Sequence, residues 1–269
     1  MGLMQMSDIK VSYAILTHNE TDSLQKLLDH LFDKKSVFDE IVIVDDYSDN
    51  LDTIKIINKS EDRGAKVFRH QLNNHFADQK NFATSKCRNE YIFSIDADEI
   101  LDDNLIETFK EVLYINPDVD MFSIPRINIV NDITLNHIGA WRWHVAQLPE
   151  LTVTAKKSEM TSELQALIKS YNLLINDDGN DILYYKPIIN WPDYQNRVYK
   201  NNSEIKWHRP IHEFINGHKT YTRFPMEKQY SIIHEKNVKI QENQNKLYQG
   251  IYNDQIKNPE EYNKRTRNV

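Results

Sequence analysis

Two aspartates that could together bind a metal ion occur at Asp96 and Asp98, directly after the apolar run at residues 91–95. Side chains alternate in direction along an extended segment, so both carboxylates point the same way. Two carboxylates on one side offer the hard oxygen ligands that Mg²⁺ and Mn²⁺ prefer. Such an ion can bridge two phosphate groups and stabilise a leaving diphosphate. Asp-x-Asp is a common pattern, however, and on its own it is explained more simply as an acidic turn that caps the next helix.

Two further polar segments follow apolar runs in the same way. Residues 17–20 follow the apolar run at 11–16, and the pair Asp45 and Asp46 follows the apolar run at 41–44. The acidic pair has two interpretations. It could cap a helix that starts near Leu51, or it could accept hydrogen bonds from a base imide or from ribose hydroxyls. The sequence alone leaves both interpretations open.

The first 125 residues alternate between short apolar runs, typical of buried strands, and stretches with apolar residues at helical spacing. The predicted strands are residues 11–16, 41–44, 66–69, 91–95 and 121–125, and the predicted helices are residues 24–31, 51–57, 78–88 and 105–113. This alternation predicts an α/β fold with a mostly parallel sheet, right-handed crossovers and flanking helices. Ligands of such sheets bind beyond the carboxyl ends of the strands, which is where the three polar segments lie.

Beyond residue 126 the regular pattern ends, then returns, and finally gives way to a helix. An insertion with aromatic residues precedes a second group of strands, and an exposed helix rich in Gln, Asn and Lys comes last. We therefore predict one domain with a helical tail. The insertion covers residues 127–183, with a helix-like stretch at 162–174 and a polar turn at 176–180; the returning strands cover 186–233; the domain covers 1–235, with halves at 9–125 and 186–235; and the tail covers 236–269, with a helix at 235–262 and a basic end at 264–269.

The composition limits the class of protein. The 269 residues are 40% hydrophobic and 27% charged, which is typical of a soluble globular chain that can bury a core. A net charge of −7 provides no basic field, so we expect no nucleic-acid partner. The single cysteine, Cys87, excludes an internal disulfide framework and fits a reducing compartment. With no signal-peptide pattern and no run of about 18 apolar residues, we expect a cytoplasmic location.

Several segments together resemble the family 2 glycosyltransferases of the GT-A fold. The segments are residues 11–20, 41–49 and 91–99, Phe-Ala-Asp-Gln-Lys-Asn-Phe-Ala at 76–83, Trp-Pro-Asp-Tyr-Gln-Asn-Arg-Val-Tyr at 191–199, and Pro-Ile-His-Glu at 210–213. The later motifs are similar to a bacterial branch that includes lipopolysaccharide-core glucosyltransferases. Several motifs in the same order are much more specific than any one of them. The resemblance covers residues 9–125 and 186–235.

The resemblance implies a nucleotide-diphosphate sugar as donor, with uridine as the favoured base, and a hydroxyl of a glycan or glycolipid as acceptor. It implies Mn²⁺ or Mg²⁺ as cofactor, and peripheral membrane contact where the acceptor is linked to a lipid. It also assigns roles to single residues. The implied donor-binding residues are Thr17, Glu20 and Asp46 for the base and ribose, Gln79 and Lys80 over the base or diphosphate, Asp96 for the ribose or metal, and Arg197 for the diphosphate, with a structural ion pair as its alternative. The implied metal ligands are Asp98, Asp96 and His212, and His234 competes with His212.

The family inverts the anomeric centre by a single displacement, which requires a general base for the acceptor hydroxyl. Asp193 is the first candidate, because Asp193 and Arg197 resemble the acid-then-Arg motif that carries the base in this family. Glu213 is the second candidate. Pro192 stands where the usual pattern has an acid, so the choice between them remains open. Four tryptophans could stack on sugar faces, although core packing is the default for a single Trp: Trp141, Trp143, Trp191 and Trp207.

Three other classes of protein explain part of the pattern. A nucleotidyltransferase would also use an α/β fold and a metal, but it normally has a Gly-rich loop after the first strand, and residues 16–20 contain no Gly. A non-catalytic nucleotide-sugar-binding subunit is an alternative, although all of the metal-site acids are present here. A response-regulator-like domain would explain Asp45 and Asp46 but not the residues after 125. The sequence therefore predicts a metal-dependent glycosyltransferase, with hexosyl transfer favoured.

Overall fold

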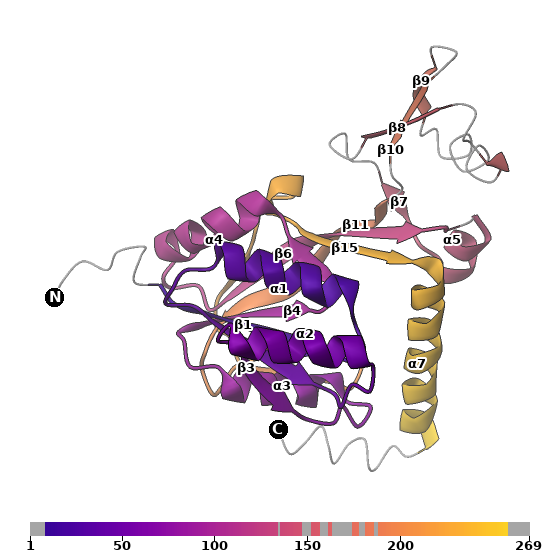
Figure 1. Cartoon of the computed structure of the whole chain (residues 1–269). Coiled ribbons are helices and arrows are strands. Elements are labelled where there is room, and N and C mark those ends of the chain that lie inside the picture. Colours follow the sequence, from indigo (N-terminus) through magenta and orange to yellow (C-terminus); the bar gives the residue numbers. More distant parts are fainter. Residues whose placement is uncertain are drawn as a thin grey trace.

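The computed structural model describes residues 9–133, 135–146, 152–156, 161–162, 174–177, 181–185 and 188–257. At its centre a ten-stranded mixed sheet is flanked by helices (Figure 1). The strands of this sheet are β1 (Val11–Thr17), β2 (Glu40–Asp45), β3 (Lys66–Arg69), β4 (Tyr91–Asp96), β5 (Glu99–Leu101), β6 (Met121–Asn131), β7 (Val145–Ala146), β11 (Ile188–Lys200), β14 (Tyr221–Arg223) and β15 (Ile232–Asn237). The α-helices are α1 (Asp22–Lys34), α2 (Leu51–Asp62), α3 (Phe76–Lys86), α4 (Asp103–Ile115), α5 (Leu135–Trp141) and α7 (Val238–Lys257).

The strand order in the main sheet is β3-β2-β1-β4-β11-β6-β15-β5, with β14 beside β6 and β7 beside β11. The first four strands in this order are parallel to one another. β11 is antiparallel to both of its neighbours, β4 and β6, whereas β15 is parallel to β6. The expected α/β fold, with a mostly parallel sheet flanked by helices, is confirmed.

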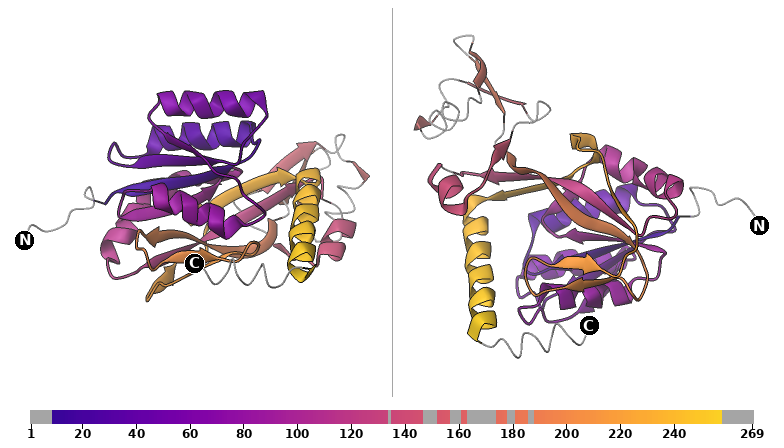
Figure 2. Two further views of the ribbon diagram at one scale, coloured as in Figure 1. Left: turned by 90° about the horizontal axis from the view of Figure 1, so that it is seen from below. Right: turned by 180° about the vertical axis from the view of Figure 1, so that it is seen from behind.

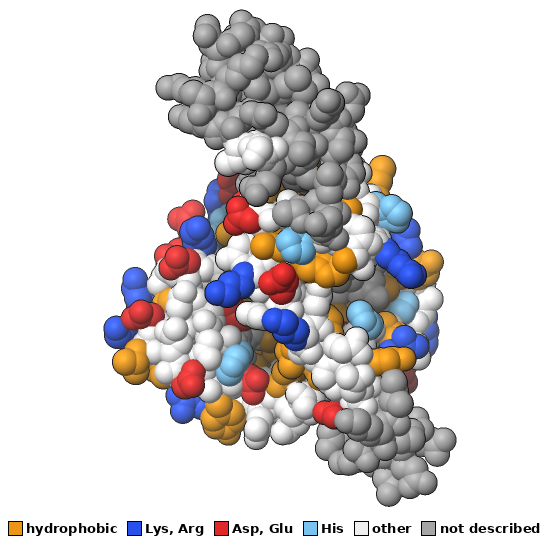
Figure 3. Space-filling view, turned by 90° about the vertical axis from the view of Figure 1, so that its right-hand side faces the viewer, with side chains coloured by type: hydrophobic (Ala, Val, Ile, Leu, Met, Phe, Trp, Pro, Cys, Tyr) orange, Lys and Arg blue, Asp and Glu red, His pale blue; other side chains and the backbone are white. Residues whose placement is uncertain are grey.

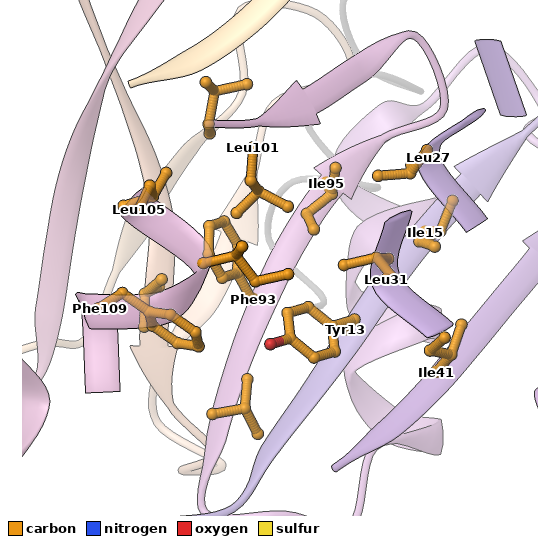
Figure 4. Close-up of a cluster of buried hydrophobic side chains, with 14 of the residues drawn as sticks. Tyr13, Ile15, Leu27, Leu31, Ile41, Phe93, Ile95, Leu101, Leu105 and Phe109 are labelled. Atoms are coloured by element: carbon orange, nitrogen blue, oxygen red, sulfur yellow. The ribbon is translucent and has the colours of Figure 1, made fainter. Parts of the chain in front are cut away.

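The two faces of the sheet carry different helices because alternate residues of each strand point to opposite sides. On one face Tyr13 and Ile15 pack against α1, α2 and α4, in the cluster that Figure 4 draws. On the other face Ala14 packs against α3 and the hairpin formed by β12 (Lys206–His208) and β13 (Phe214–Asn216). Figure 2 shows the two coverings on opposite sides of the sheet in its left-hand view.

Helix α1 illustrates why these elements form. Its apolar side consists of fully buried leucines at helical spacing: Leu24, Leu27, Leu28 and Leu31. Burial of each such side chain stabilises the fold by about 1.5–3 kcal/mol. The helix begins at Asp22, two residues before the predicted start, and ends near Lys34, whose charge suits a helix C-terminus.

Neither acidic pair caps a helix, so that interpretation is wrong for both. The side chain that caps α2 belongs to Asn50, which accepts hydrogen bonds from the backbone N–H groups of Asp52 and Thr53. The side chain that caps α4 belongs to Asp102. Asp46 and Asp98 are thus available for another role.

The second half of the chain differs in detail from the expectation. Residues 127–131 belong to β6, so the sheet reaches into the predicted insertion. A small sheet is formed by β8 (Thr152–Lys156), β10 (Asp181–Tyr185) and β9 (Leu174–Asp177). Leu174 therefore begins a strand, while the interior of the helix predicted at 162–174, most of the turn at 176–180 and the end at 258–269 lie outside the described residues. The predicted terminal helix starts at Val238 because β15 continues to Asn237.

Strand β5 was not predicted, because three residues are too few to show a period. It pairs antiparallel with β15 and brings Glu99 opposite His234. Among the described helices, none has the length and apolarity to cross a membrane.

Candidate functional site

The carboxyl ends of β1, β2 and β4 meet at one edge of the sheet. In the parallel register Thr17 stands opposite Asp45, and Leu16 stands opposite Asp96. A cleft of about 860 Å³ opens there. All twelve residues to which the resemblance gave a role line it: Thr17, Glu20, Asp46, Gln79, Lys80, Asp96, Asp98, Asp193, Arg197, His212, Glu213 and His234. Of the four tryptophans, Trp143 and Trp207 line the cleft, whereas Trp141 and Trp191 do not, and neither does Asp45. Figure 3 looks onto the side of the molecule that carries α7, where acidic, basic and histidine side chains lie together.

Asp98 and His234 form the pair best suited to a metal ion. Nε2 of His234 lies 3.0 Å from Oδ2 of Asp98. Burial alone would raise the pKa of Asp98, but the neighbouring His234 lowers it to about 2, so the carboxylate is ionised at neutral pH. The competitor His234, rather than His212, therefore contacts Asp98. His212 lines the same cleft, and its ring packs edge-on against Tyr248 at 5.8 Å.

A neighbouring amide fixes the tautomer of His234. Nδ2 of Asn128 donates to Asp193 at 2.8 Å, so the amide oxygen of Asn128 faces Nδ1 of His234, also at 2.8 Å. Nδ1 must then carry the hydrogen. Nε2 faces the carboxylate of Asp98, and a cation bound by both groups would take the place of the hydrogen between them.

The pair fits a hard divalent ion that takes its other ligands from substrate and water. Within the residues that the structure describes, no group of three or more His, Cys, Asp or Glu side chains converges on one point. Mg²⁺ is commonly bound through one or two protein ligands together with substrate phosphates and water. Asp98 and His234 provide such a set, and the side chain of Asp96 contacts Arg197 and Lys80.

Asp96 belongs to a buried ion-pair network around Arg197. This arginine is 1% exposed and donates to both Asp96, at 2.6 Å, and Glu99. Glu99 also accepts a hydrogen bond from Arg126 and, through its other oxygen, from the backbone N–H of Asp96. Burial opposes ionisation of Asp96, but Arg197 and Lys80 hold its pKa well below the usual range. For Arg197 the structure thus favours the ion-pair interpretation.

Asp193 is held by hydrogen bonds from three residues. Arg126 and Asn128 contact its Oδ2, and Gln195 donates to its Oδ1 at 2.7 Å. Burial would raise the pKa of Asp193, but Arg126 and the two amides lower it. The carboxylate is fixed in orientation, faces the cleft and is ionised at neutral pH.

Glu213 and Lys80 form a second charged pair in the cleft. Their Nζ and Oε1 atoms are 2.6 Å apart, and the ammonium also lies over the ring of Trp207, 4.5 Å from its centroid. Burial would raise the pKa of Glu213, but Lys80 lowers it. Lys80 is itself buried, so the negative charge of Glu213 and the ring face stabilise an ammonium that is shielded from water.

A set of polar contacts lies around the ends of β1 and β2. The hydroxyl of Thr17 donates to Glu20 at 2.8 Å. Asp46 accepts from the backbone N–H of Leu72 at 2.8 Å. Gln79 donates to the carbonyl of His70, also at 2.8 Å. These bonds tie the loop before α3 to the ends of the strands. This part of the cleft is therefore held in place by β1, β2 and α3.

Three residues of the site were missed by sequence analysis: Arg126, Asn128 and Lys236. Arg126 follows the predicted strand at 121–125, so the rule that pointed to the other strand ends could have found it. Asn128 and Lys236 carry no comparable signal, because β6 and β15 run beyond the apolar stretches. Burial lowers the pKa of Lys236 to about 8, and its Nζ donates to Gln244 of α7.

The family of the chain follows from a direct match. The sequence model described as "Glycosyl transferase family 2" matches residues 12–173, and the chain belongs to this family. Its fold is the GT-A fold of that family, and its class is that of the transferases.

Curated relatives are similar to a limited part of the chain. An uncharacterized glycosyltransferase of Rickettsia felis is 34% identical over 103 residues, which cover 38% of this chain and 34% of the relative. One of Rickettsia bellii is 33% identical over 103 residues, covering 38% and 32%. The chain thus spans about a third of the length of these relatives.

Two solved structures are similar to parts of the chain. The mannosyltransferase PcManGT from Pyrobaculum calidifontis, in complex with GDP-Man and Mn²⁺, has a TM-score of 0.36 and 20% identity, covering 43% of this chain and 35% of that one. TarS of S. aureus has a TM-score of 0.39 and 20% identity, covering 61% and 30%.

Proposed function

We propose that this chain is an inverting, divalent-metal-dependent glycosyltransferase that moves a sugar, a hexosyl group being favoured, from a nucleotide-diphosphate donor to a hydroxyl acceptor. The observation that carries the proposal is the contact between Asp98 and His234, placed where the ends of β1, β2 and β4 meet. A family 2 glycosyltransferase needs a site for a charged diphosphate at this edge of its sheet.

Asp98 and His234 would hold Mg²⁺ or Mn²⁺. When bound, the ion supplies positive charge that stabilises the departing diphosphate. Asn128 orients His234 for this role, and the buried network around Arg197 holds Asp96 beside the pair. We assign Asp96 to the ribose side of the donor.

The base and ribose of the donor are proposed to bind between Thr17, Glu20 and Asp46, at the ends of the first two strands. The resemblance of these segments to the family favours uridine. Among the described residues of α3, Lys80 is the cation that lines the cleft. It is proposed to lie along the diphosphate. Its pairing with Glu213 holds the ammonium in place before the donor arrives.

Asp193 is proposed as the general base. In a single displacement the acceptor oxygen forms a bond to the anomeric carbon while the bond from that carbon to the diphosphate oxygen breaks, and the acceptor proton passes to a carboxylate. Asp193 is ionised, faces the cleft and is linked through Asn128 to His234, so the base and the metal pair keep a fixed spacing. Glu213 is the second candidate, but its charge already serves Lys80.

The acceptor is proposed to be a glycan or glycolipid, following the similarity of the later motifs to the lipopolysaccharide-core branch. The proposed location is the cytoplasm, with peripheral membrane contact where the acceptor is linked to a lipid.

The test is a panel of UDP-, GDP-, CDP- and ADP-sugars, assayed for released nucleotide with and without Mn²⁺ or Mg²⁺. We expect slow hydrolysis of one donor that requires metal. Asp98→Asn should reduce it by roughly 10²-fold, because an electrostatic contact to the leaving group is lost. Asp52→Asn, an exposed acid on α2, is the matched control. If no donor is bound or hydrolysed, the proposal fails; full metal-dependent turnover by Asp98→Asn would refute the metal site alone.

A further inference from the structure

The cleft has one charged side and one neutral side. Its charged residues lie at the strand ends and around Arg197, apart from Lys236 of β15, whose ammonium reaches Gln244 of α7. Ten other lining residues carry no charge: Val130, Trp143, Ile189 and Asn190 from the body of the protein, and Ile240, Gln241, Asn243, Gln244, Leu247 and Tyr248 from α7. We call these ten residues the neutral wall. The roles assigned so far use only the charged side.

Helix α7 is fastened at its start and near its middle. At its start Val238 packs on the cluster that contains Val130, Ile189 and Trp143. Further along, the ring of Tyr248 contacts Phe76 at 5.9 Å. Figure 1 shows α7 running along the side of the molecule from the end of β15. The helix is therefore held as one fixed side of the cleft.

The face that α7 turns to the cleft combines apolar side chains with amides. Ile240, Gln244 and Leu247 follow at helical spacing and share this face. Ile240 is 51% exposed and Leu247 is 43% exposed, although both are large and apolar. Gln244 accepts a hydrogen bond from Lys236, which fixes the orientation of its amide. Exposed apolar groups beside oriented amides are suited to a ligand with both C–H faces and hydroxyls.

Trp143 faces this helix from the body of the protein. Its backbone N–H donates to Ile138, and its ring packs on Trp141 with centroids 4.8 Å apart. Asn190 pairs with the backbone of His144 through both its N–H and its side-chain oxygen. An indole held in this way offers a rigid apolar surface at low conformational cost.

We infer that the neutral wall is the acceptor subsite and that it binds an uncharged, hydroxyl-rich sugar ring. The inference rests on the proposed function and deepens it. A sugar ring packs its C–H face on an indole or an aliphatic side chain and exchanges hydrogen bonds with amides. The ten residues supply both kinds of contact, and the cation that borders them, Lys236, is engaged by Gln244.

The position of Asp193 supports the same assignment. Its carboxylate is bound by Arg126 of the charged side and by Asn128, which also contacts the carbonyl of Ile189 in the neutral wall. A sugar on this wall would have its hydroxyls near the proposed base, which Asn128 also links to His234 of the metal pair. The division of the cleft by charge matches the division of the reaction into an anionic donor and a neutral acceptor.

The test measures binding directly. Methyl glycosides of glucose, galactose, mannose and N-acetylglucosamine, with glycerol 3-phosphate as an anionic probe, are titrated into the full chain with UDP and Mn²⁺ and followed by ligand-observed NMR. The variants are Trp143→Ala, Trp143→Phe and, as a control on α7 outside the neutral wall, Gln249→Ala.

At least one glycoside should bind the wild type, Trp143→Ala should weaken it about tenfold, and Trp143→Phe should restore most of the affinity because the ring face returns. Gln249→Ala should bind like the wild type. The inference is overturned if no glycoside binds, if only glycerol 3-phosphate binds, or if Trp143→Ala binds glycosides as well as the wild type does. UDP affinity and nucleotide release from the donor panel are scored separately, so a chain that binds glycosides but no nucleotide would refute the proposed function instead.

Discussion

Nε2 of His234 lies 3.0 Å from Oδ2 of Asp98, although 136 residues separate them in the chain. The pairing of β5 with β15 brings them together, since it places Glu99 opposite His234. Behind them Asn128 joins His234 to Asp193, so one amide serves two groups that take part in different steps of the proposed reaction.

Removal of this amide should impair the metal pair without touching it directly. We predict that Asn128→Ala weakens Mn²⁺ binding by about 10–100-fold, because the group that orients a metal-binding His is lost. Electron paramagnetic resonance of free Mn²⁺ in the presence of UDP measures this. Asn104→Ala, whose side chain donates to the carbonyl of Gln229 and does not contact the pair, is the control. Unchanged Mn²⁺ affinity in Asn128→Ala would mean that His234 needs no such orientation or is not a ligand.

The proposed base should reveal itself in the pH dependence of transfer. Asp193→Asn should lower transfer by roughly 10²-fold or more while UDP binding changes little. In the wild type Arg126 lowers the pKa of Asp193, so the carboxylate form persists below the ordinary Asp pKa of about 3.9 and transfer has no acid limb near neutral pH.

Arg126→Gln removes that cation, so the pKa of Asp193 should rise and transfer should begin to fall at a higher pH than in the wild type. The profile of kcat/KM against pH measures the shift. If Glu213 is the base instead, Lys80→Gln will move the acid limb and Arg126→Gln will not, since Lys80 is the cation that lowers the pKa of Glu213.

The network around Arg197 should contribute to stability as well as to the site. Arg197→Met leaves Asp96 and Glu99 buried without one of their cations, and we predict a loss of about 3–5 kcal/mol in the free energy of unfolding. Urea denaturation measures it. Lys55→Met breaks an exposed pair with Asp52 and should change the same quantity by less than about 1 kcal/mol. Similar losses in the two variants would show that the buried network stabilises the fold no more than an exposed ion pair does.

Local pattern was enough to predict the strands of the first half of the domain and where they end. The runs at 11–16, 41–44 and 91–95 are buried strands, and the polar residues after them meet at one edge, because parallel strands end on the same side. The resemblance to family 2 supplied the remaining site residues, and all of them line the cleft. Their individual roles remain predictions.

Other features depend on contacts that no local pattern carries. The sequence could not choose between His212 and His234, because only the pairing of β5 with β15 brings one of them to Asp98. Asn50 rather than Asp46 caps α2, and both residues have suitable side chains, so the choice depends on where the helix begins. Arg126 and Asn128 alternate with buried isoleucines in a strand that was expected to end at residue 125.

The strand order has a consequence for how the protein is made. β11 lies between β4 and β6, so when residue 131 has just left the ribosome the chain contains two strands whose mutual neighbour has not yet been synthesised. Until residues 188–200 arrive, β4 and β6 each present an unpaired edge, and open edges invite pairing with other chains. Because long-range pairings of this kind form slowly, the nascent half-sheet is the stage at which a chaperone would be of most use.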